Sequence, residues 1–302
     1  MATANILVPS TTGTLTVWGG TKDGKDGYID YETVTSNLIP PATIEITAHD
    51  IRHFNQKPSY KDNGYELVNA PTSITTEQFL GSSTPEGKEF IDDAYYKECT
   101  DLVRRITGST TVFPISFRIR QDKAPREEEV DRARIKLHAG SAGSHGPRPV
   151  AHVDRDPSTA TTMLRDLFGD QKAAEMMKEH NRWAQVNVWR PIENVVQKWP
   201  LAFMNHDRIP DWDYDKFTGR IYNRNDPRVE HRGEKAYDCL VKNDPRYMFH
   251  YASNMTPSEA LVFSSFDTDV RFVIPHSAFW DDNTPQGALP RKSIEVRTLV
   301  FW

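Results

Sequence analysis

The chain ends in the run RKSIEVRTLVFW, residues 291–302, and this run indicates the kind of fold that the protein adopts. Successive side chains of a strand point to opposite faces, so Ile294 and Val296 share an apolar face. The other face then carries a polar and charged series: Arg291, Ser293, Glu295 and Arg297. A charged face on a strand that is otherwise suited to a core predicts a barrel with a polar interior.

Three runs further upstream favour the same architecture. β-Branched and aromatic residues dominate WAQVNVWRPI (183–192), ALVFSSFD (260–267) and VRFVIPHSAFW (270–280). Proline-containing or polar connections separate these runs, and helical periodicity is scarce in the last hundred residues. We therefore predict a mainly β fold, a sandwich or a barrel, with flanking helices packed outside it.

The first half of the chain adds two helical stretches. The clearer one covers residues 85–106, with Thr84 suited to the N-cap and Gly108 to the C-terminal end. Apolar side chains recur along it at helical spacing, which predicts a buried face that begins at Phe90. The second covers residues 161–181 with a break at Gly169. Strands or loops are expected at Thr14–Trp18, Thr43–Ala48, Tyr65–Asn69 and Thr111–Arg120, where Pro114 limits the last one to a sheet edge or a bulge.

The composition excludes several classes of protein. The formal net charge is −5 and Lys and Arg form no basic stripe, so nucleic acid and an anionic membrane are poor candidates for partners. Two cysteines, Cys99 and Cys239, make no disulfide framework. No apolar stretch is long enough to span a membrane, and no secretory signal is recognised, so we expect a cytoplasmic protein. The mixed-charge run 118–134 is interpreted as a solvated loop or a short helix face.

The triplet His152-Val153-Asp154 places an imidazole and a carboxylate on one face of a strand, about 6.5 Å apart. Such a pair can converge on one metal ion. A second histidine from a neighbouring strand would complete the 2-His-1-carboxylate triad of non-haem Fe(II) oxygenases. With 10 His and 42 acidic residues among 302, chance alone supplies a triplet of this kind, so only its setting is informative. A loop rich in Gly and Pro precedes it, and β-rich runs follow.

His276 is the candidate for the second histidine, because it follows an apolar run that we expect to form a strand. Arg291 comes fifteen residues later and opens the last strand. Its guanidinium can bind the far carboxylate of 2-oxoglutarate bidentately, and the Ser293 hydroxyl can add a hydrogen bond. Arg297 is the competing anchor, since it lies on the same face, and it could instead pair with Glu295.

The order of these motifs resembles a known family. His-x-Asp, a distal histidine 124 positions later and then Arg-x-Ser are similar to the Fe(II)/2-oxoglutarate-dependent oxygenases. The segments AHVD, NVWRPI, MTPSEALVF, DTD, IPHSAF and PRKSIEVRTLVF more narrowly resemble the branch named for AsaB. That branch includes CmcJ-like and gibberellin-desaturase-like proteins, and the matches run in order from about residue 113 to the C-terminus.

The resemblance implies a fold and a chemistry. The fold is a double-stranded β-helix core, also called a jelly roll and cupin-like, in a single domain of residues 1–302. Strands and a helix of residues 1–110 pack on the core of residues 111–302, which carries a helical insertion at about 158–182. The resemblance also implies that Fe(II) is held by His152, Asp154 and His276, with 2-oxoglutarate and O2 as co-substrates. The enzyme would hydroxylate, desaturate or cyclise a small molecule of secondary metabolism at an unactivated C–H bond.

Two other functions fit the same residues. An iron-dependent oxidase would keep the triad but draw all its electrons from the substrate, and a non-catalytic jelly-roll protein would hold a structural metal. Arg118 and Arg190 are candidates for substrate contacts and equally for structural salt bridges. His145 lies in a Gly-rich loop and is interpreted as a surface residue rather than a further ligand.

Overall fold

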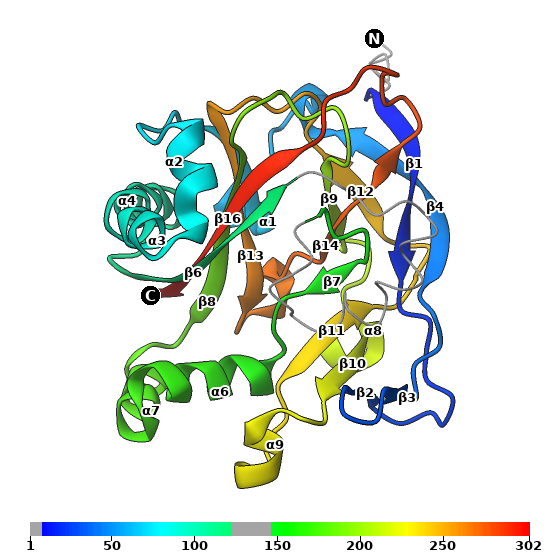
Figure 1. Cartoon of the computed structure of the whole chain (residues 1–302). Helices are drawn as coiled ribbons and strands as arrows, with labels where there is room; N and C mark the ends of the chain where they lie inside the picture. The colour runs from blue at the N-terminus through cyan, green and yellow to red at the C-terminus, as the bar shows by residue number, and fades with distance from the viewer. Residues whose placement is uncertain (1–7, 122–145) are drawn as a thin grey trace.

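The computed structural model describes residues 8–121 and 146–302, and in these ranges two β-sheets pack against each other (Figure 1). The smaller sheet has the order β5-β13-β8-β16-β6, with the bounds Tyr65–Asn69, Glu259–Asp267, Trp183–Pro191, Lys292–Phe301 and Thr111–Gln121. The larger sheet has the order β15-β1-β4-β12-β9-β14-β7-β11-β10-β2-β3. Its bounds, in that order, are Trp280–Asp281, Ser10–Val17, Ala42–Asp50, Met248–Tyr251, Leu201–Asn205, His276–Ala278, His152–Val153, Tyr237–Val241, Thr218–Asn223, Gly27–Asp30 and Thr35–Ser36.

Strand β16 lies inside the smaller sheet, between β8 and β6, and shows the alternation that its sequence predicts. Ile294 and Val296 are fully buried in a core shared with the helices. The opposite face turns toward the larger sheet, where Arg297 reaches Asp154 and Leu299 joins the main core. The strand therefore separates an apolar helical layer from a polar interior.

Strand β6 forms the edge of the smaller sheet, as Pro114 predicts. Its pairing with β16 shifts between Arg297 and Thr298, the point at which Pro114 takes its place in the register. Proline lacks the N–H that a regular ladder needs, so an edge bulge is where the sheet accepts it.

Helices cover the outer face of the smaller sheet, on the left of Figure 1. The predicted helix 85–106 consists of α3 (Pro85–Phe90), a π-helical turn (Ile91–Tyr95) and α4 (Tyr96–Thr107). Thr84 accepts a hydrogen bond from Gly87 N at 3.1 Å, and Gly108 ends the helix with a φ of 75°. The expected burial of Phe90 is wrong: it is 37% exposed, whereas Ile91 is buried. The wider π turn rotates the residues before it relative to those after it.

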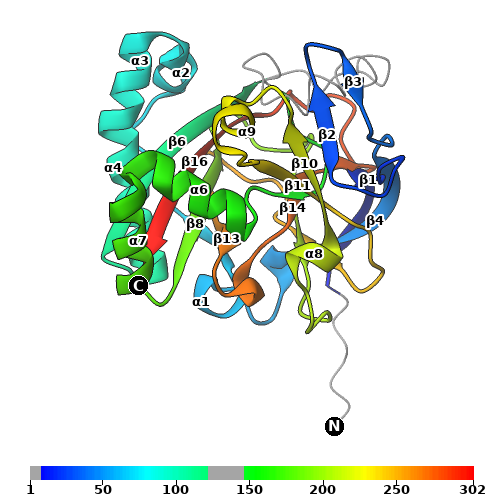
Figure 2. The same cartoon turned by 90° about the horizontal axis from the view of Figure 1, so that it is seen from below.

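The remaining helices are short or belong to one insertion. The insertion consists of α6 (Pro157–Phe168) and α7 (Asp170–Glu179), which lie on the side that faces the viewer in Figure 2. The predicted break at Gly169 is confirmed, with a φ of 80° at that residue. The other helices are α1 (Tyr60–Asn63), α2 (Thr76–Leu80), α8 (Tyr214–Phe217) and α9 (Pro227–Arg232), and the 3-10 turns are Ile51–His53, Gly81–Ser83 and Val270–Phe272.

The run 270–280 is only partly extended, which corrects the prediction that His276 follows an apolar strand. Val270–Phe272 form a 3-10 turn, and the Asp269 side chain caps it by accepting a hydrogen bond from Arg271 N at 3.2 Å. Because this turn takes up the first part of the run, β14 begins at His276 itself.

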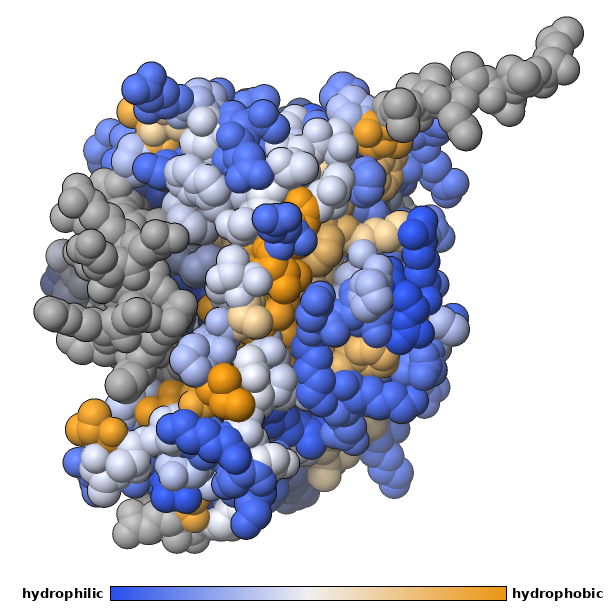
Figure 3. All heavy atoms as spheres, turned by 90° about the vertical axis from the view of Figure 1, so that its right-hand side faces the viewer, coloured by the Kyte–Doolittle hydropathy of each residue, from blue (hydrophilic) through white to orange (hydrophobic). Residues whose placement is uncertain are grey.

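The molecular surface is mostly polar. Figure 3 shows one face on which a band of hydrophobic residues runs between larger hydrophilic areas. Apolar atoms are common on the surface of folded proteins, so single exposed side chains such as Ile39 need no partner. Within the described ranges, every helix is too short or too polar to cross a bilayer.

Candidate metal centre

The predicted triad assembles at the neighbouring strands β7 and β14. His152 and His276 are directly paired in the register, and their ring centroids lie 4.4 Å apart. Asp154 follows β7, and its Oδ1 lies 3.8 Å from Nε2 of His152. The candidate ligand atoms of all three residues fall within 4.8 Å of one another, and each residue is at most 6% exposed. Residues 124 positions apart in the chain thus share one buried point.

Backbone carbonyls fix the orientation of both imidazoles. His152 Nδ1 lies 2.8 Å from Val150 O, and His276 Nδ1 lies 3.0 Å from Ile274 O. A carbonyl only accepts, so each Nδ1 carries the proton and each Nε2 keeps a free lone pair. The buried Nε2 of His276 has no hydrogen-bond partner in the part of the chain that the structure describes. Buried polar atoms normally have partners, so this one fits a ligand atom for a divalent metal.

The protonation states also fit a metal. Burial, together with the charges of Arg148 and His276, holds the pKa of His152 well below its usual value, so the imidazole is neutral. Burial alone would raise the pKa of Asp154, but Arg297 lowers it well below its usual range, so the carboxyl is ionised. A neutral imidazole and a carboxylate are the forms that coordinate.

A group of polar side chains from the smaller sheet holds Asp154. Its Oδ2 accepts hydrogen bonds from Asn187 Nδ2 at 2.8 Å, Gln185 Nε2 at 3.0 Å and Arg297 Nε at 3.2 Å. Ser265 on β13 links the two amides. These contacts leave Oδ1 directed at the histidines. Sequence reasoning missed Asn187, Gln185 and Ser265 as site residues, although polar amides at alternate positions of an apolar strand are a usable signal.

The two candidate anchors for 2-oxoglutarate differ in what they already contact. Arg297 is committed to carboxylates, since its Nη2 lies 2.7 Å from Glu295 Oε1 and its Nε binds Asp154. Arg291 donates Nη1 to the carbonyl of Trp199, while its Nε and the Ser293 hydroxyl are buried without a partner among the described residues. Burial and the nearby Arg120 lower the pKa of Arg291 to about 9, which indicates a cation without a full counter-charge. Arg291 and Ser293 therefore have buried donors without partners in the described residues, whereas Arg297 already contacts two carboxylates.

The structure separates the two arginines that sequence proposed as substrate contacts. Arg118 lies opposite Glu295 on β6, so it shares the face that Arg297 presents to Asp154. Arg190 lies opposite Ile294, on the other face of the sheet, with its guanidinium 5.5 Å from the ring of Tyr95. The alternation of side chains along β8 thus directs Arg190 toward the helical layer. This position corrects the expectation that Arg190 contacts the substrate. His145 lies outside the described residues.

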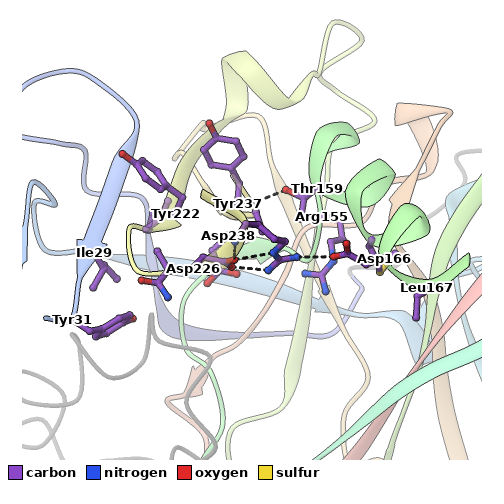
Figure 4. A pocket seen from close by; sticks show the side chains of 15 residues that line it. Ile29, Tyr31, Arg155, Thr159, Asp166, Leu167, Tyr222, Asp226, Tyr237 and Asp238 are labelled. Atoms are coloured by element: carbon purple, nitrogen blue, oxygen red, sulfur yellow. Dashed lines mark hydrogen bonds and ion pairs between the residues drawn. The ribbon is translucent and has the colours of Figure 1, made fainter. Parts of the chain in front are cut away.

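A cavity of about 400 Å³ lies between β10, β11 and α6 (Figure 4). Arg155, the residue after Asp154, forms part of its wall. Asp238 and Ile221 face each other across β11 and β10 and also line it. Two residues beyond Asp238, Leu240 pairs with His152, so these lining residues and the triad share one face of the larger sheet.

Ion pairs form part of the cavity wall. Arg228 contacts Asp226 at 2.7 Å and Asp166 at 3.2 Å, and Tyr237 N donates to Thr159 Oγ1, as the dashed lines in Figure 4 show. The cavity is therefore a defined space with aromatic and charged walls.

Comparison with known proteins places this site in context. Residues 21–301 match the family model described as an oxidoreductase/YMDC permease-like domain. Oxidoreductase R1 of Phoma sp. is 48% identical over 304 residues, covering 100% of both chains. The hydroxylase/desaturase efuI of Hormonema carpetanum is 30% identical over 310 residues, covering 99% of this chain and 98% of its own. The alpha-ketoglutarate-dependent dioxygenase tstK of Talaromyces stipitatus is 27% identical over 287 residues, covering 94% and 92%.

The solved structures include a similar fold. The iron and alpha-ketoglutarate-dependent endoperoxidase NvfI superposes with a TM-score of 0.74 at 19% identity, covering 97% of this chain and 98% of its own. This likeness confirms the predicted mainly β fold with a jelly-roll core and flanking helices.

Proposed function

The chain belongs to the oxidoreductase family whose model matches residues 21–301, and from this premise we propose that it is an Fe(II)/2-oxoglutarate-dependent oxygenase. The proposed reaction is oxidation of an unactivated C–H bond of a small molecule in secondary metabolism. Relatives named as a hydroxylase/desaturase and as an alpha-ketoglutarate-dependent dioxygenase support the same branch that the sequence motifs indicate. The observation that carries the proposal is the buried His–Asp–His cluster with an unpartnered Nε2.

In this proposal His152, Asp154 and His276 would hold the iron, and a site with three protein ligands would leave coordination positions for co-substrates. Iron with 2-oxoglutarate and O2 supplies the oxidising chemistry when bound. The chain's own contribution is orientation: carbonyls of Val150 and Ile274 fix the imidazoles, and the amides of β8 fix the carboxylate. Burial of all three ligands excludes bulk water from the reacting centre.

We assign the far carboxylate of 2-oxoglutarate to Arg291 and Ser293, because their donors are buried and unpartnered in the described residues. Bidentate binding to a guanidinium would supply the missing counter-charge. Arg297 has a different task in this proposal. Its ion pair with Asp154 holds the metal ligand in place.

The remaining assignments follow from the same proposal. The partner is a small molecule rather than nucleic acid or a membrane, and the location is the cytoplasm. A single domain is supported by β1 and β4, which join the same sheet as the triad strands β7 and β14.

The experiment that tests the proposal measures succinate. Protein purified without O2 receives Fe(II), 2-oxoglutarate and then O2, with a panel of small organic substrates. We expect succinate from the wild-type protein and none from the His276→Ala variant or after chelation of the metal. Absence of succinate from the wild-type protein across the panel, or a tightly bound zinc ion in place of labile iron, would contradict the proposal.

A further inference from the structure

The walls around the triad carry more positive than negative charge. The described residues near the triad include six arginines and three carboxylates. The arginines are Arg118, Arg120, Arg148, Arg155, Arg291 and Arg297, and the carboxylates are Asp154, Glu295 and Asp238. We propose that the substrate of this enzyme is a carboxylic acid, and that Arg118 and Arg120 bind its carboxylate. This inference rests on the proposed function and adds the chemical class of the molecule that is oxidised.

The register places both arginines at the site. Arg120 pairs with Ser293 and Arg118 with Glu295, so both share the face on which Arg297 contacts Asp154. Residues two apart on a strand lie about 6.5 Å from each other, so the two guanidiniums can bind one carboxylate together. Strand β6 is the edge of its sheet and Arg118 is exposed, so a molecule arriving from solvent can reach the pair.

The carboxylates of the site are already used by other arginines. Arg148 lies 2.9 Å from Asp238, and Arg297 binds both Asp154 and Glu295. Glu295 sits across from Arg118 but directs Oε1 to Arg297.

The two proposed arginines lack such a partner. Arg120 donates Nη1 to Gly146 O at 3.0 Å, a neutral acceptor. Arg118 has neither a hydrogen bond nor an ion pair within residues 8–121 and 146–302. No carboxylate of the described chain therefore forms an ion pair with either group, and Glu295, which lies near both, is already paired with Arg297.

Bound co-substrates do not remove this excess. The two positive charges of Fe(II) are balanced by the two negative charges of 2-oxoglutarate, whose far carboxylate is assigned to Arg291. Burial and the neighbouring arginines lower the pKa of Arg120 to about 10, so the protein holds this cation at a cost in stability. An anionic ligand would offset that cost, and sites that bind ligands commonly carry such unfavourable charge.

The cavity of about 400 Å³ gives the rest of the molecule a place. Arg155, one residue after Asp154, lines it, and the rest of its lining mixes tyrosines and apolar residues with the charged side chains of Asp166, Asp226, Arg228 and Asp238. Figure 4 shows these tyrosines around the space. The inferred substrate is thus an acid whose carboxylate lies near β6 and whose remaining part, which includes polar or aromatic groups, lies toward β10 and β11.

The test compares an acid with its neutral amide. Protein loaded with Ni(II) and saturating 2-oxoglutarate, which does not turn over, is titrated calorimetrically with 4-phenylbutyrate and with 4-phenylbutyramide. We expect the acid to bind at least tenfold more tightly. Arg118→Gln and Arg120→Gln should each weaken binding of the acid about tenfold and leave the amide unchanged, the usual effect of losing one charge-assisted hydrogen bond.

One control variant and three refuting outcomes complete the test. Arg104→Gln, at an exposed position of α4, should change neither affinity. Equal binding of acid and amide, no binding of the acid, or displacement of 2-oxoglutarate by the acid would each overturn the inference. The proposed function fails in a different way, by absence of 2-oxoglutarate binding to the metal-loaded protein, so the two failures are distinguishable.

Discussion

Replacement of Arg291 by glutamine separates the co-substrate anchor from the arginine that supports the metal. Arg291 Nε and Ser293 Oγ are buried donors on the β16 side of the site that lack partners in the described residues, whereas Arg297 is held by Asp154 and Glu295. A hydrogen bond to a charged group contributes about 1.5–3 kcal/mol, and about 1.4 kcal/mol corresponds to a factor of ten. Arg291→Gln should therefore raise the KM for 2-oxoglutarate about 10- to 100-fold.

The assay is succinate formation at increasing 2-oxoglutarate, with iron affinity measured in parallel. Arg291→Gln should keep the iron affinity and recover most of kcat at saturating co-substrate. Arg297→Gln is the matched variant on the same strand face; it should lower the metal affinity about 10- to 100-fold, because it removes an ion pair from Asp154. If instead the KM for 2-oxoglutarate rises only in the Arg297 variant, the two roles are exchanged. An unchanged 2-oxoglutarate dependence in both variants would favour an oxidase that does not use the keto acid.

Further predictions concern the metal, its support and stability. Ni(II) at a hundredfold excess over its Kd should stabilise the fold by about 2.7 kcal/mol, seen as a rise in Tm that His276→Ala abolishes; an equal rise in that variant would place the metal elsewhere. Asn187→Ala should lower metal affinity about tenfold in equilibrium titration, since it removes the 2.8 Å bond to Asp154; unchanged affinity would make this amide structural only. Arg118→Gln should leave the free energy of unfolding within about 0.5 kcal/mol of wild type or raise it, measured in urea, whereas a large loss would indicate a structural ion pair. Burial lowers the pKa of His250 to about 4, so below pH 6.5 the unfolded chain binds a proton that the folded protein does not. The free energy of unfolding should therefore fall by up to about 1.4 kcal/mol per pH unit between pH 6.5 and about 4. His250→Gln should flatten this pH dependence, and an unchanged dependence would refute the role of His250.

Local sequence patterns predict a strand well where one of its faces is apolar and the other is polar. The alternation in β16 correctly assigns Ile294 and Val296 to one side and Arg297 to the other. The prediction for Phe90 failed because a π turn changes the helical phase, and no residue type marks such a turn in the sequence. The expected strand before His276 failed because a side-chain cap at Asp269 outweighs the β propensity of the apolar residues that follow.

The site was predictable only in part. His152 and Asp154 are two residues apart, so local geometry links them, but the pairing of His152 with His276 depends on a long-range register. The sequence also does not show on which face of the sheet Arg190 lies, because this depends on how β8 pairs with its neighbours. Knowing that Asn187 faces inward would have placed Arg190 outward, since the two are three residues apart and side chains alternate.

Strand β16 sets the spacing between the separate parts of the site. It is paired on both sides, with β8 and β6, so Ser293 and Arg297 are spaced by the strand itself, and Arg291 directly precedes its first residue. Strand β8 is its direct neighbour and carries Asn187 opposite Arg297, which means that two donors to Asp154 come from adjacent positions of one sheet. The metal ligands belong to the other sheet. The distances between the 2-oxoglutarate anchor, the side chains that support Asp154 and the metal ligands are therefore set by backbone pairing and by the packing of two sheets. A substitution that shifts the β16–β8 register should abolish metal binding and 2-oxoglutarate binding together.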